Sequence, residues 1–155
     1  MKPIILGGKS TTIYRSGTPV LASVVALDKA LELALTNLDT RLEYVTKLNK
    51  EVISFLKNHN NIHINNTENS IPYTINFSIK GITSDEFVKK LSDNNVFVST
   101  KTSCCPEKTP SKMVYALTND KSLAKSSIRV SLSHLTTKED LEKFYEVFDK
   151  CYGEI

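Results

Sequence analysis

The chain has 155 residues, of which 40% are hydrophobic and 24% charged, and its formal net charge is +3. A chain of this length can bury one hydrophobic core without disulfides or metal ions. The basic residues are dispersed among acidic ones, and no apolar run approaches the roughly 18 residues that span a membrane. We therefore expect neither nucleic acid nor a membrane as a partner.

Two helical patterns open the chain. Thr18 and Pro19 are typical of a helix N-cap and of the first helical position. Apolar residues then recur at helical spacing, at Leu21, Val24, Val25, Leu27 and Leu31. The same spacing resumes at Leu38, Leu42, Val45, Leu48, Val52, Ile53 and Leu56. This predicts a second helix, or a continuation bent near residues 36–39, that runs to about Asn58.

Extended and helical patterns alternate in the middle of the chain. IHI is predicted to be extended, and residues 71–81, IPYTINFSIKG, alternate apolar and polar side chains as a half-buried strand does. TSDEFVKKLSDNN predicts a short helix capped at Thr83 or Ser84, because acidic residues fill its first turn. We expect a further strand over VFVST, residues 96–100.

The last third predicts a short helix over TPSKMVYALTND, a strand over SSIRVSLS and a final amphipathic helix over TTKEDLEKFYEVFDKCYGEI. In the strand, Ile128, Val130 and Leu132 face one side. The predicted order is α-α-β-β-α-β-α-β-α. Few strands separated by helices favour an α+β domain, with a small sheet covered on one side by helices.

Cys104 and Cys105 are adjacent in the polar stretch VSTKTSCCPEK. A catalytic cysteine reacts as its thiolate, and Lys101 and Lys108 would help to lower the usual thiol pKa of about 8.5. A pair of small buried side chains is an equally good interpretation of these residues alone. Zinc requires about four ligands, and two adjacent cysteines with three dispersed histidines lack the usual spacing, so we expect no metal site.

The cysteines and the first residues bear on the location of the chain. Three cysteines, two of them adjacent, make a poor disulfide framework, which favours a reducing compartment. The apolar opening is only five residues long and is interrupted by Pro3, unlike a secretion signal. We therefore expect a cytoplasmic protein.

Arg129 lies on the apolar strand, where a guanidinium costs free energy unless it meets an anion, and its planar fork suits a carboxylate. An exposed or salt-bridged structural arginine is the alternative. Thr18, which follows Gly17 at the predicted helix start, could donate a hydrogen bond to a phosphate, although ordinary capping explains it equally well. GGKST lacks the first glycine of a phosphate-binding loop, so we exclude a nucleoside triphosphate site.

Five segments, taken in their order along the chain, are informative about the family: GGKSTTIYRSGTP, IPYTINFSIKGITSDEF, VSTKTSCC, PSKMVYAL and SSIRVSLSHLTTKEDLEKF. Together they resemble the C-terminal small domain of cysteine desulfurases, in the class V aminotransferase family of pyridoxal phosphate (PLP) enzymes, over nearly the whole chain. The resemblance implies the small domain of a PLP fold type I enzyme, with a mainly antiparallel sheet after a long N-terminal helix. Residues 1–18 would then be the remnant of a connection to a large domain, 19–58 a linking helix or helix pair, and 59–155 the small domain.

The resemblance also implies a reaction, in which a homodimeric enzyme converts L-cysteine to L-alanine. Cys104 matches the cysteine that takes the sulfur as a persulfide and passes it to an acceptor scaffold protein, as in iron–sulfur cluster assembly. Cys105 stands where the family commonly has serine. Arg129 matches the arginine that grips the substrate α-carboxylate. Thr18 matches the threonine that contacts the cofactor phosphate across the dimer.

The sequence departs from the family pattern at four points. GGKST replaces Gly-Gly-Gly-x-Glu, Lys101 replaces a loop glycine, and His134 stands where an arginine often occurs. In the family the cofactor-binding lysine precedes the Gly-Gly motif by a few tens of residues, and here that motif begins seven residues from Met1. We therefore expect a C-terminal fragment that binds no PLP and is inactive alone. Another class V enzyme, such as a selenocysteine lyase or an aminotransferase, and a non-catalytic sulfur-acceptor or scaffold-binding module are the alternatives.

Overall fold

The computed structural model describes residues 2–8, 14–100 and 109–154. The chain divides into two compact units, Met1–Asp39 and Thr40–Ile155. The described part contains no helix with both the length and the apolar character that a membrane crossing requires.

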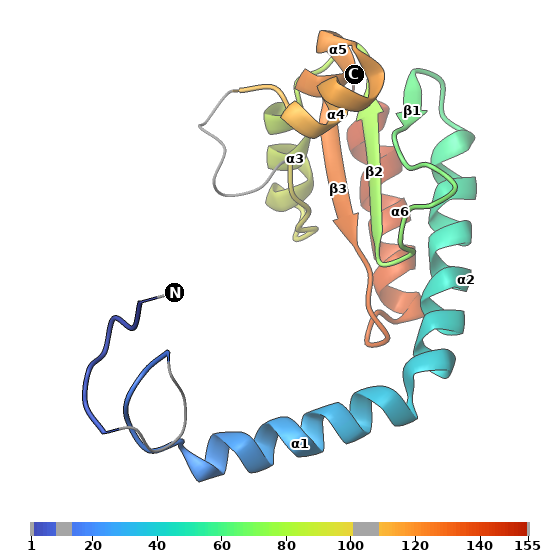
Figure 1. The fold of residues 1–155 in the computed structure, drawn as a ribbon. Helices are drawn as coiled ribbons and strands as arrows, with labels where there is room; N and C mark the ends of the chain where they lie inside the picture. Colours follow the sequence, from blue (N-terminus) through green and yellow to red (C-terminus); the bar gives the residue numbers. More distant parts are fainter. Residues whose placement is uncertain (1, 9–13, 101–108, 155) are drawn as a thin grey trace. The chain divides into compact units, whose positions relative to one another are not determined.

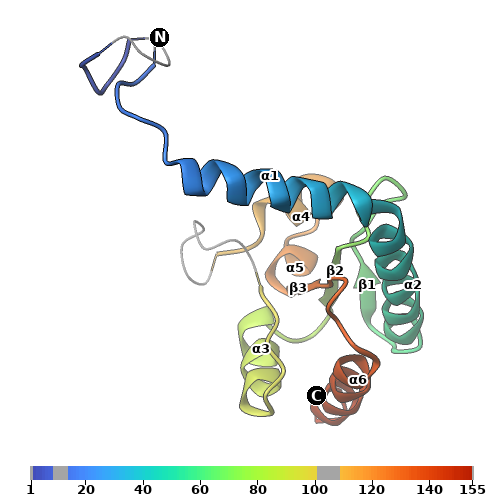
Figure 2. The same cartoon turned by 90° about the horizontal axis from the view of Figure 1, so that it is seen from below.

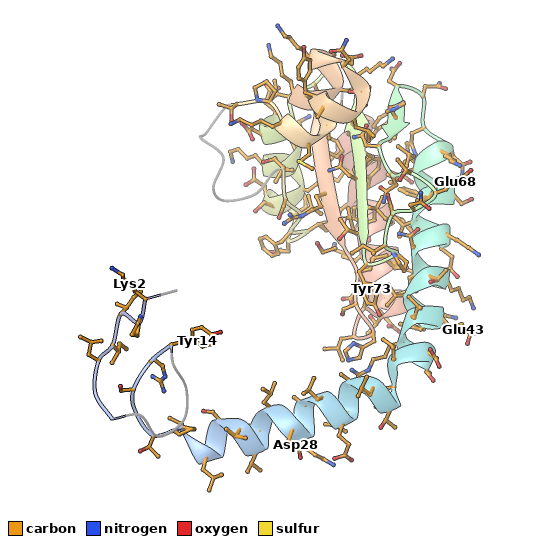
Figure 3. All side chains as sticks on the ribbon, in the orientation of Figure 1. Lys2, Tyr14, Asp28, Glu43, Glu68 and Tyr73 are labelled. Carbon is orange, nitrogen blue, oxygen red and sulfur yellow. The ribbon has the colours of Figure 1, made fainter. Side chains whose placement is uncertain are left out.

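Helix α1, Leu21–Thr36, is the main element of the first unit. Its N-cap is Val20, whose carbonyl oxygen accepts the backbone N–H groups of Ser23 and Val24 at 3.0 and 3.2 Å. The prediction that Thr18 caps this helix and that Pro19 is its first residue was wrong, because the first helical hydrogen bonds start from the Val20 carbonyl. The helix buries none of its residues, and Figure 3 shows side chains standing out from it on several sides.

The second unit contains a three-stranded antiparallel sheet, drawn in Figure 1, with β2 at its centre. Its strands are β1, Ile62–Ile64, β2, Thr74–Ile79, and β3, Ser127–Ser131. Ile64 pairs with Phe77 in β2, and Phe77 pairs with Ile128 in β3. The strands predicted over IHI, within residues 71–81, and over SSIRVSLS are confirmed.

Three helices cover one face of this sheet: α2, Leu38–Lys57, α3, Ser84–Asp93, and α6, Lys138–Tyr152. Alternate strand residues point into the core between the sheet and these helices, at Ile75, Phe77, Ile79, Ile128 and Val130. The fully buried Phe148 of α6 lies edge-to-face with Phe77 and Phe87, with ring centroids 5.9 and 5.2 Å apart. The predicted α+β fold, with helices over one side of a small sheet, is confirmed.

Helices α4, Lys112–Thr118, and α5, Lys121–Lys125, lie on the other side of the sheet from α3 and α6 (Figure 2). One helix was predicted here, but Asn119 adopts a left-handed conformation (φ 52°) that ends α4. Asp120 then caps α5 by accepting the N–H groups of Ser122 and Leu123. The Ser78 hydroxyl on β2 donates to the carbonyl of Leu123 at 2.8 Å, which ties α5 to the sheet.

The strand predicted over residues 96–100 is absent from the described structure. Only Ser99 pairs with β3, through an isolated antiparallel bridge to Arg129. Val96 is buried while Phe97 is 76% exposed. The buried side chain of Val96 and the single bridge at Ser99 therefore hold this segment, in place of a continuous series of strand hydrogen bonds.

The second unit includes helix α2. Helix α2 buries Val45, Leu48, Val52 and Leu56 in the same core as the sheet, and the compact unit begins at Thr40. The assignment of residues 1–18 and 19–58 to a connection between two domains, and of 59–155 to the small domain, stays a prediction.

Candidate functional site

The face of the sheet opposite the core is polar. The side-chain alternation that sends Ile75 and Phe77 into the core places Asn76 on this face, and the alternation in β3 does the same for Arg129. Asn76 and Arg129 are direct cross-strand partners. Both residues line a pocket of about 430 Å³ within the second unit. The other residues around this pocket are Asn65, Thr67, Ser70, Thr100, Ser111, Lys112, Met113, Val114 and Leu117.

The backbone of Arg129 is held at the outer edge of β3. Its N–H donates to the carbonyl of Ser99 at 2.6 Å, and the N–H of Ser99 donates to the carbonyl of Arg129 at 3.0 Å. Because both backbone groups of Arg129 face Ser99, Arg129 and Asn76 form a non-hydrogen-bonded pair. In such a pair the two side chains lie closest, with Cα atoms about 4.5 Å apart.

The guanidinium of Arg129 has no counter-charge in the described part of the chain. Its Nε is buried without a hydrogen-bond partner, and no ion pair to Arg129 is present among the described residues. The described residues of the pocket lining include Lys112 but no aspartate or glutamate. A partly buried cation without a partner costs free energy that a bound anion recovers. The pocket therefore favours a small anion. The planar guanidinium of Arg129 suits a carboxylate, because its N–H donors match the two carboxylate oxygens.

Asn65, which sequence reasoning missed, is 6% exposed and lies just after β1. Its Nδ2 donates to Oδ1 of Asn76 at 2.7 Å and to the hydroxyl of Ser78 at 2.8 Å. Its own Oδ1 is buried without a partner among the described residues. An asparagine after a short strand reads as an ordinary turn residue, and no pattern in the sequence links it to Arg129.

Among the described residues, Arg129 is the one predicted site residue that lines this pocket. Thr18 belongs to the first unit, where it is exposed and follows Gly17 at φ 120°. Cys104 and Cys105, with Lys101 and Lys108, lie outside the described residues. The described part of the chain contains no cluster of three or more metal-ligating side chains.

Cys151 on α6 is buried in the core, at 1% exposure. Burial raises the pKa of its thiol, and the carboxylate of Glu154 raises that pKa further. A buried thiol with a raised pKa is the opposite of an activated nucleophile. The core position of Cys151 therefore argues against a role as a nucleophile.

Comparison with known families places the chain. The sequence model of the family described as aminotransferase class-V matches residues 7–144. The chain belongs to the class-V aminotransferase family. This match includes both Thr18 and Arg129.

Named class-V relatives agree with this placement. The chain is 32% identical over 151 residues to the cysteine desulfurase IscS of Dictyoglomus turgidum. This alignment covers 96% of the chain and 38% of that relative. It is 29% identical over 144 residues to a protein of Encephalitozoon cuniculi named cysteine desulfurase, mitosomal, covering 92% of the chain and 33% of that protein. The crystal structure of a NifS-like protein from Rickettsia africae matches with a TM-score of 0.80 at 27% identity, over 97% of the chain and 40% of that structure. The chain thus spans about 40% or less of these relatives.

Proposed function

We propose that the chain is the C-terminal small domain of a PLP-dependent cysteine desulfurase, which converts L-cysteine to L-alanine and transfers the sulfur to an acceptor. The observation that carries this proposal is the guanidinium of Arg129, which has no counter-charge among the described residues and lies in a pocket whose described lining contains no acidic residue. Two of the compared relatives carry the name cysteine desulfurase. Since the chain spans only 38% of the first of them, we propose that the rest of the enzyme completes the site.

Arg129 would bind the α-carboxylate of the substrate through two parallel N–H donors, as a planar guanidinium does. Lys112 adds positive charge on the same pocket, while Val114 and Leu117 of α4 give it an apolar wall. A pocket of about 430 Å³ holds a small amino acid. The charge and size of the pocket therefore fit L-cysteine.

Cys104 would be the residue that receives the sulfur. Four peptide units separate it from Thr100, which lines the pocket, so covalent geometry keeps the two Cα atoms within about 14 Å of each other. In this step the thiolate of Cys104 forms an S–S bond to the substrate sulfur while the C–S bond of the substrate breaks. The substrate carbon takes a proton and becomes the methyl group of alanine, and Cys104 keeps the persulfide.

PLP, when bound, supplies the electron sink for this bond cleavage. The exposed hydroxyl of Thr18, placed after the turn at Gly17, fits a hydrogen bond to the phosphate of the cofactor. We propose that Thr18 makes this contact to the partner subunit of a homodimer. The first unit, which contains Thr18, would then contribute to the active site of the partner subunit rather than to the pocket at Arg129.

We further propose a cytoplasmic protein that passes sulfur to a scaffold protein, in support of iron–sulfur cluster assembly. The uneven cysteine spacing supports a reducing compartment. One relative is named for the mitosome, so fractionation of cells with an antibody against the chain would test this location directly.

The test of the proposed activity uses the enzyme that contains this chain, supplied with PLP and L-cysteine, and measures alanine together with protein-bound persulfide. We expect Cys104→Ala to abolish both persulfide and sulfide release, because no thiolate remains to take the sulfur. Cys105→Ala is the matched control and should keep the activity. Normal sulfide release by the Cys104→Ala variant would contradict the assignment of Cys104, and absence of alanine from the unaltered enzyme would contradict the activity itself.

A further inference from the structure

Asn76 and Arg129 are placed to act on the same ligand. They are opposite each other on neighbouring strands, their side chains lie on the same face of the sheet, and both line the same pocket. The carboxylate that Arg129 is proposed to bind would therefore lie next to the side-chain amide of Asn76. The question is which end of this amide faces it, because the oxygen would repel a carboxylate and the nitrogen would attract it.

The buried amide of Asn65 answers this question. Its Nδ2 donates one hydrogen bond to Oδ1 of Asn76 and one to the hydroxyl of Ser78. The hydroxyl of Ser78 gives its own proton to the carbonyl of Leu123, so it must accept from Asn65. Turning the Asn65 amide over would bring its oxygen against the oxygen of Ser78, whose proton is already donated to Leu123. The hydrogen-bond network thus fixes the orientation of Asn65.

This orientation in turn fixes Asn76. Since Oδ1 of Asn76 accepts from Asn65, its Nδ2 is the end left for the pocket, and no hydrogen bond from this nitrogen exists among the described residues. The backbone of Asn76 is clamped as well. Its N–H donates to Oδ1 of Asn66 at 2.7 Å, and its carbonyl accepts the N–H of Asn65 at 2.8 Å. Asn76 therefore presents two N–H donors from a fixed position.

The arrangement has a cost that a purely structural pair would avoid. Oδ1 of Asn65 is buried without a partner among the described residues, and so is Nε of Arg129. Unsatisfied buried polar groups each destabilise a fold by about 1–3 kcal/mol, so each requires an explanation such as a functional role or a bound ligand. Two such groups border the same pocket.

We propose that Asn76 is a second donor to the carboxylate bound by Arg129, and that Asn65 is a positioning residue that keeps the N–H groups of Asn76 turned toward that carboxylate. This inference rests on the proposed role of Arg129. A neutral amide gives the pocket an extra donor without adding an acidic group beside the guanidinium. The three side chains together select ligands with a carboxylate over ligands of the same size without one.

The test titrates the 155-residue chain with L-alanine and, as a control, with L-alaninamide, which lacks the carboxylate. Binding is followed by ¹H–¹⁵N NMR of the Nε–H group of Arg129, one of three arginines in the chain. We expect saturable shifts with L-alanine only. Asn76→Ala should weaken this binding about tenfold, the value of one hydrogen bond to a charged group. Thr74→Ala, on the same strand and face but outside the pocket lining, is the matched control and should bind normally.

Three further variants separate a positioning role of Asn65 from a contribution to stability alone. Asn76→Asp keeps the acceptor for Asn65 but places an anion beside Arg129, and it should abolish binding. Asn65→Ala should weaken binding when Asn76 is present and add no further loss in the Asn65→Ala/Asn76→Ala double variant, because an orienting residue acts only through its partner. If Asn65→Ala weakened binding as much in the Asn76→Ala variant as it does in the unaltered chain, the positioning role would be overturned.

The outcomes also separate this inference from the proposed function. Binding that depends on Arg129, as shown by its loss in Arg129→Gln, but that is unchanged in Asn76→Ala would overturn the role of Asn76 and leave the role of Arg129 intact. Absence of L-alanine binding by the unaltered chain, or equal binding by Arg129→Gln, would overturn both. Circular dichroism of every variant checks that it is folded.

Discussion

At the scale of single residues, Arg129 is defined by what surrounds it. Its planar guanidinium faces a pocket that contains no acidic residue in the part of the chain that the structure describes, and its backbone is held by two hydrogen bonds to Ser99. Lysine would keep the charge at this position but lose the two parallel N–H donors that match a carboxylate. A comparison of arginine with lysine at position 129 therefore measures how much the geometry of the donors, apart from the charge, contributes to carboxylate binding.

We predict that Arg129→Lys raises the KM for L-cysteine about 10- to 100-fold in the enzyme that contains this chain, and changes kcat less. This range corresponds to the loss of one or more hydrogen bonds between charged groups. Steady-state kinetics with varied L-cysteine measures it. Arg41→Lys, on α2 and outside the pocket lining, is the control. An unchanged KM in Arg129→Lys would show that the guanidinium does not hold the substrate.

Cys151 provides a second prediction, on the reactivity of thiols. Because Cys151 is buried and its thiol pKa is raised, the native chain at pH 7 should show no more than two reactive thiols toward Ellman's reagent, while the denatured chain shows three. In Cys151→Ala the native count should stay the same and the denatured count should fall by one. A lower native count in this variant would mean that Cys151 is reachable by the reagent.

The raised pKa of Cys151 also has a consequence for stability. The folded state favours the neutral thiol, so the contribution to stability is fully present below the unfolded thiol pKa of about 8.5 and is lost as the pH rises through the folded pKa. We predict that the unaltered chain loses more unfolding free energy between pH 7 and pH 10 than Cys151→Ala does. Urea unfolding of both proteins at the two pH values gives this difference. Equal losses would show that the thiol is not responsible.

At the scale of elements, local side-chain chemistry accounts for where helices α3 and α6 begin. Thr137 caps α6 by accepting the N–H of Asp140, whose carboxylate accepts the N–H of Thr137 in return. Thr83 and Glu86 form the same reciprocal arrangement at α3. Each of these reciprocal pairs, called a capping box, satisfies two backbone N–H groups that the start of a helix leaves without partners.

We predict that Thr137→Ala lowers the free energy of unfolding by about 1 kcal/mol, because the cap of α6 is lost. Thr137→Ser keeps the hydroxyl and should cost only a small part of this. Urea denaturation followed by circular dichroism compares the three proteins. Equal stability of Thr137→Ala and the unaltered chain would indicate that packing alone sets the start of α6.

The same local chemistry explains which elements could be predicted from the sequence. The helix start at Thr83 and the strand from Thr74 have signals within a few residues, a capping box and a strict alternation. The segment VFVST carries strand-forming residues, but its pairing depends on the distant β3, and only Ser99 meets Arg129 there. Tertiary pairing overrides β-propensity in such a case.

The pocket shows the same limit more strongly. Arg129 could be singled out from the sequence alone, because a cation on an apolar strand is costly unless it meets an anion. Asn65 and Asn76 are polar residues at unremarkable positions, and their relation to Arg129 arises from the register of three strands. Hydrogen bonds between residues 11 positions apart or more in sequence cannot be read from a local pattern.

At the scale of the whole molecule, the hydrophobic core is confined to the second unit. Its buried residues and the apolar side chains packed against them all lie between Val45 and Tyr152. Helix α1 contributes no buried residue. Rings of α2, α3 and α6 and of the sheet meet around Phe148, so the unit contains the packing that its folding requires.

We predict that a chain of residues 40–155 folds alone and unfolds with the same free energy as the 155-residue chain, within about 0.5 kcal/mol, the usual spread for changes away from the core. Removal of α1 takes away exposed apolar side chains such as Leu21 and Leu35, 74% and 71% exposed, and should also lower any tendency of the chain to self-associate. Urea unfolding and sedimentation of both chains measure the two effects. Phe148→Ala in the shorter chain is the control for loss of the core, and it should cost about 3–5 kcal/mol. If the shorter chain were unfolded, α1 would be part of the folding unit, and the compact core between Val45 and Tyr152 would not be sufficient by itself.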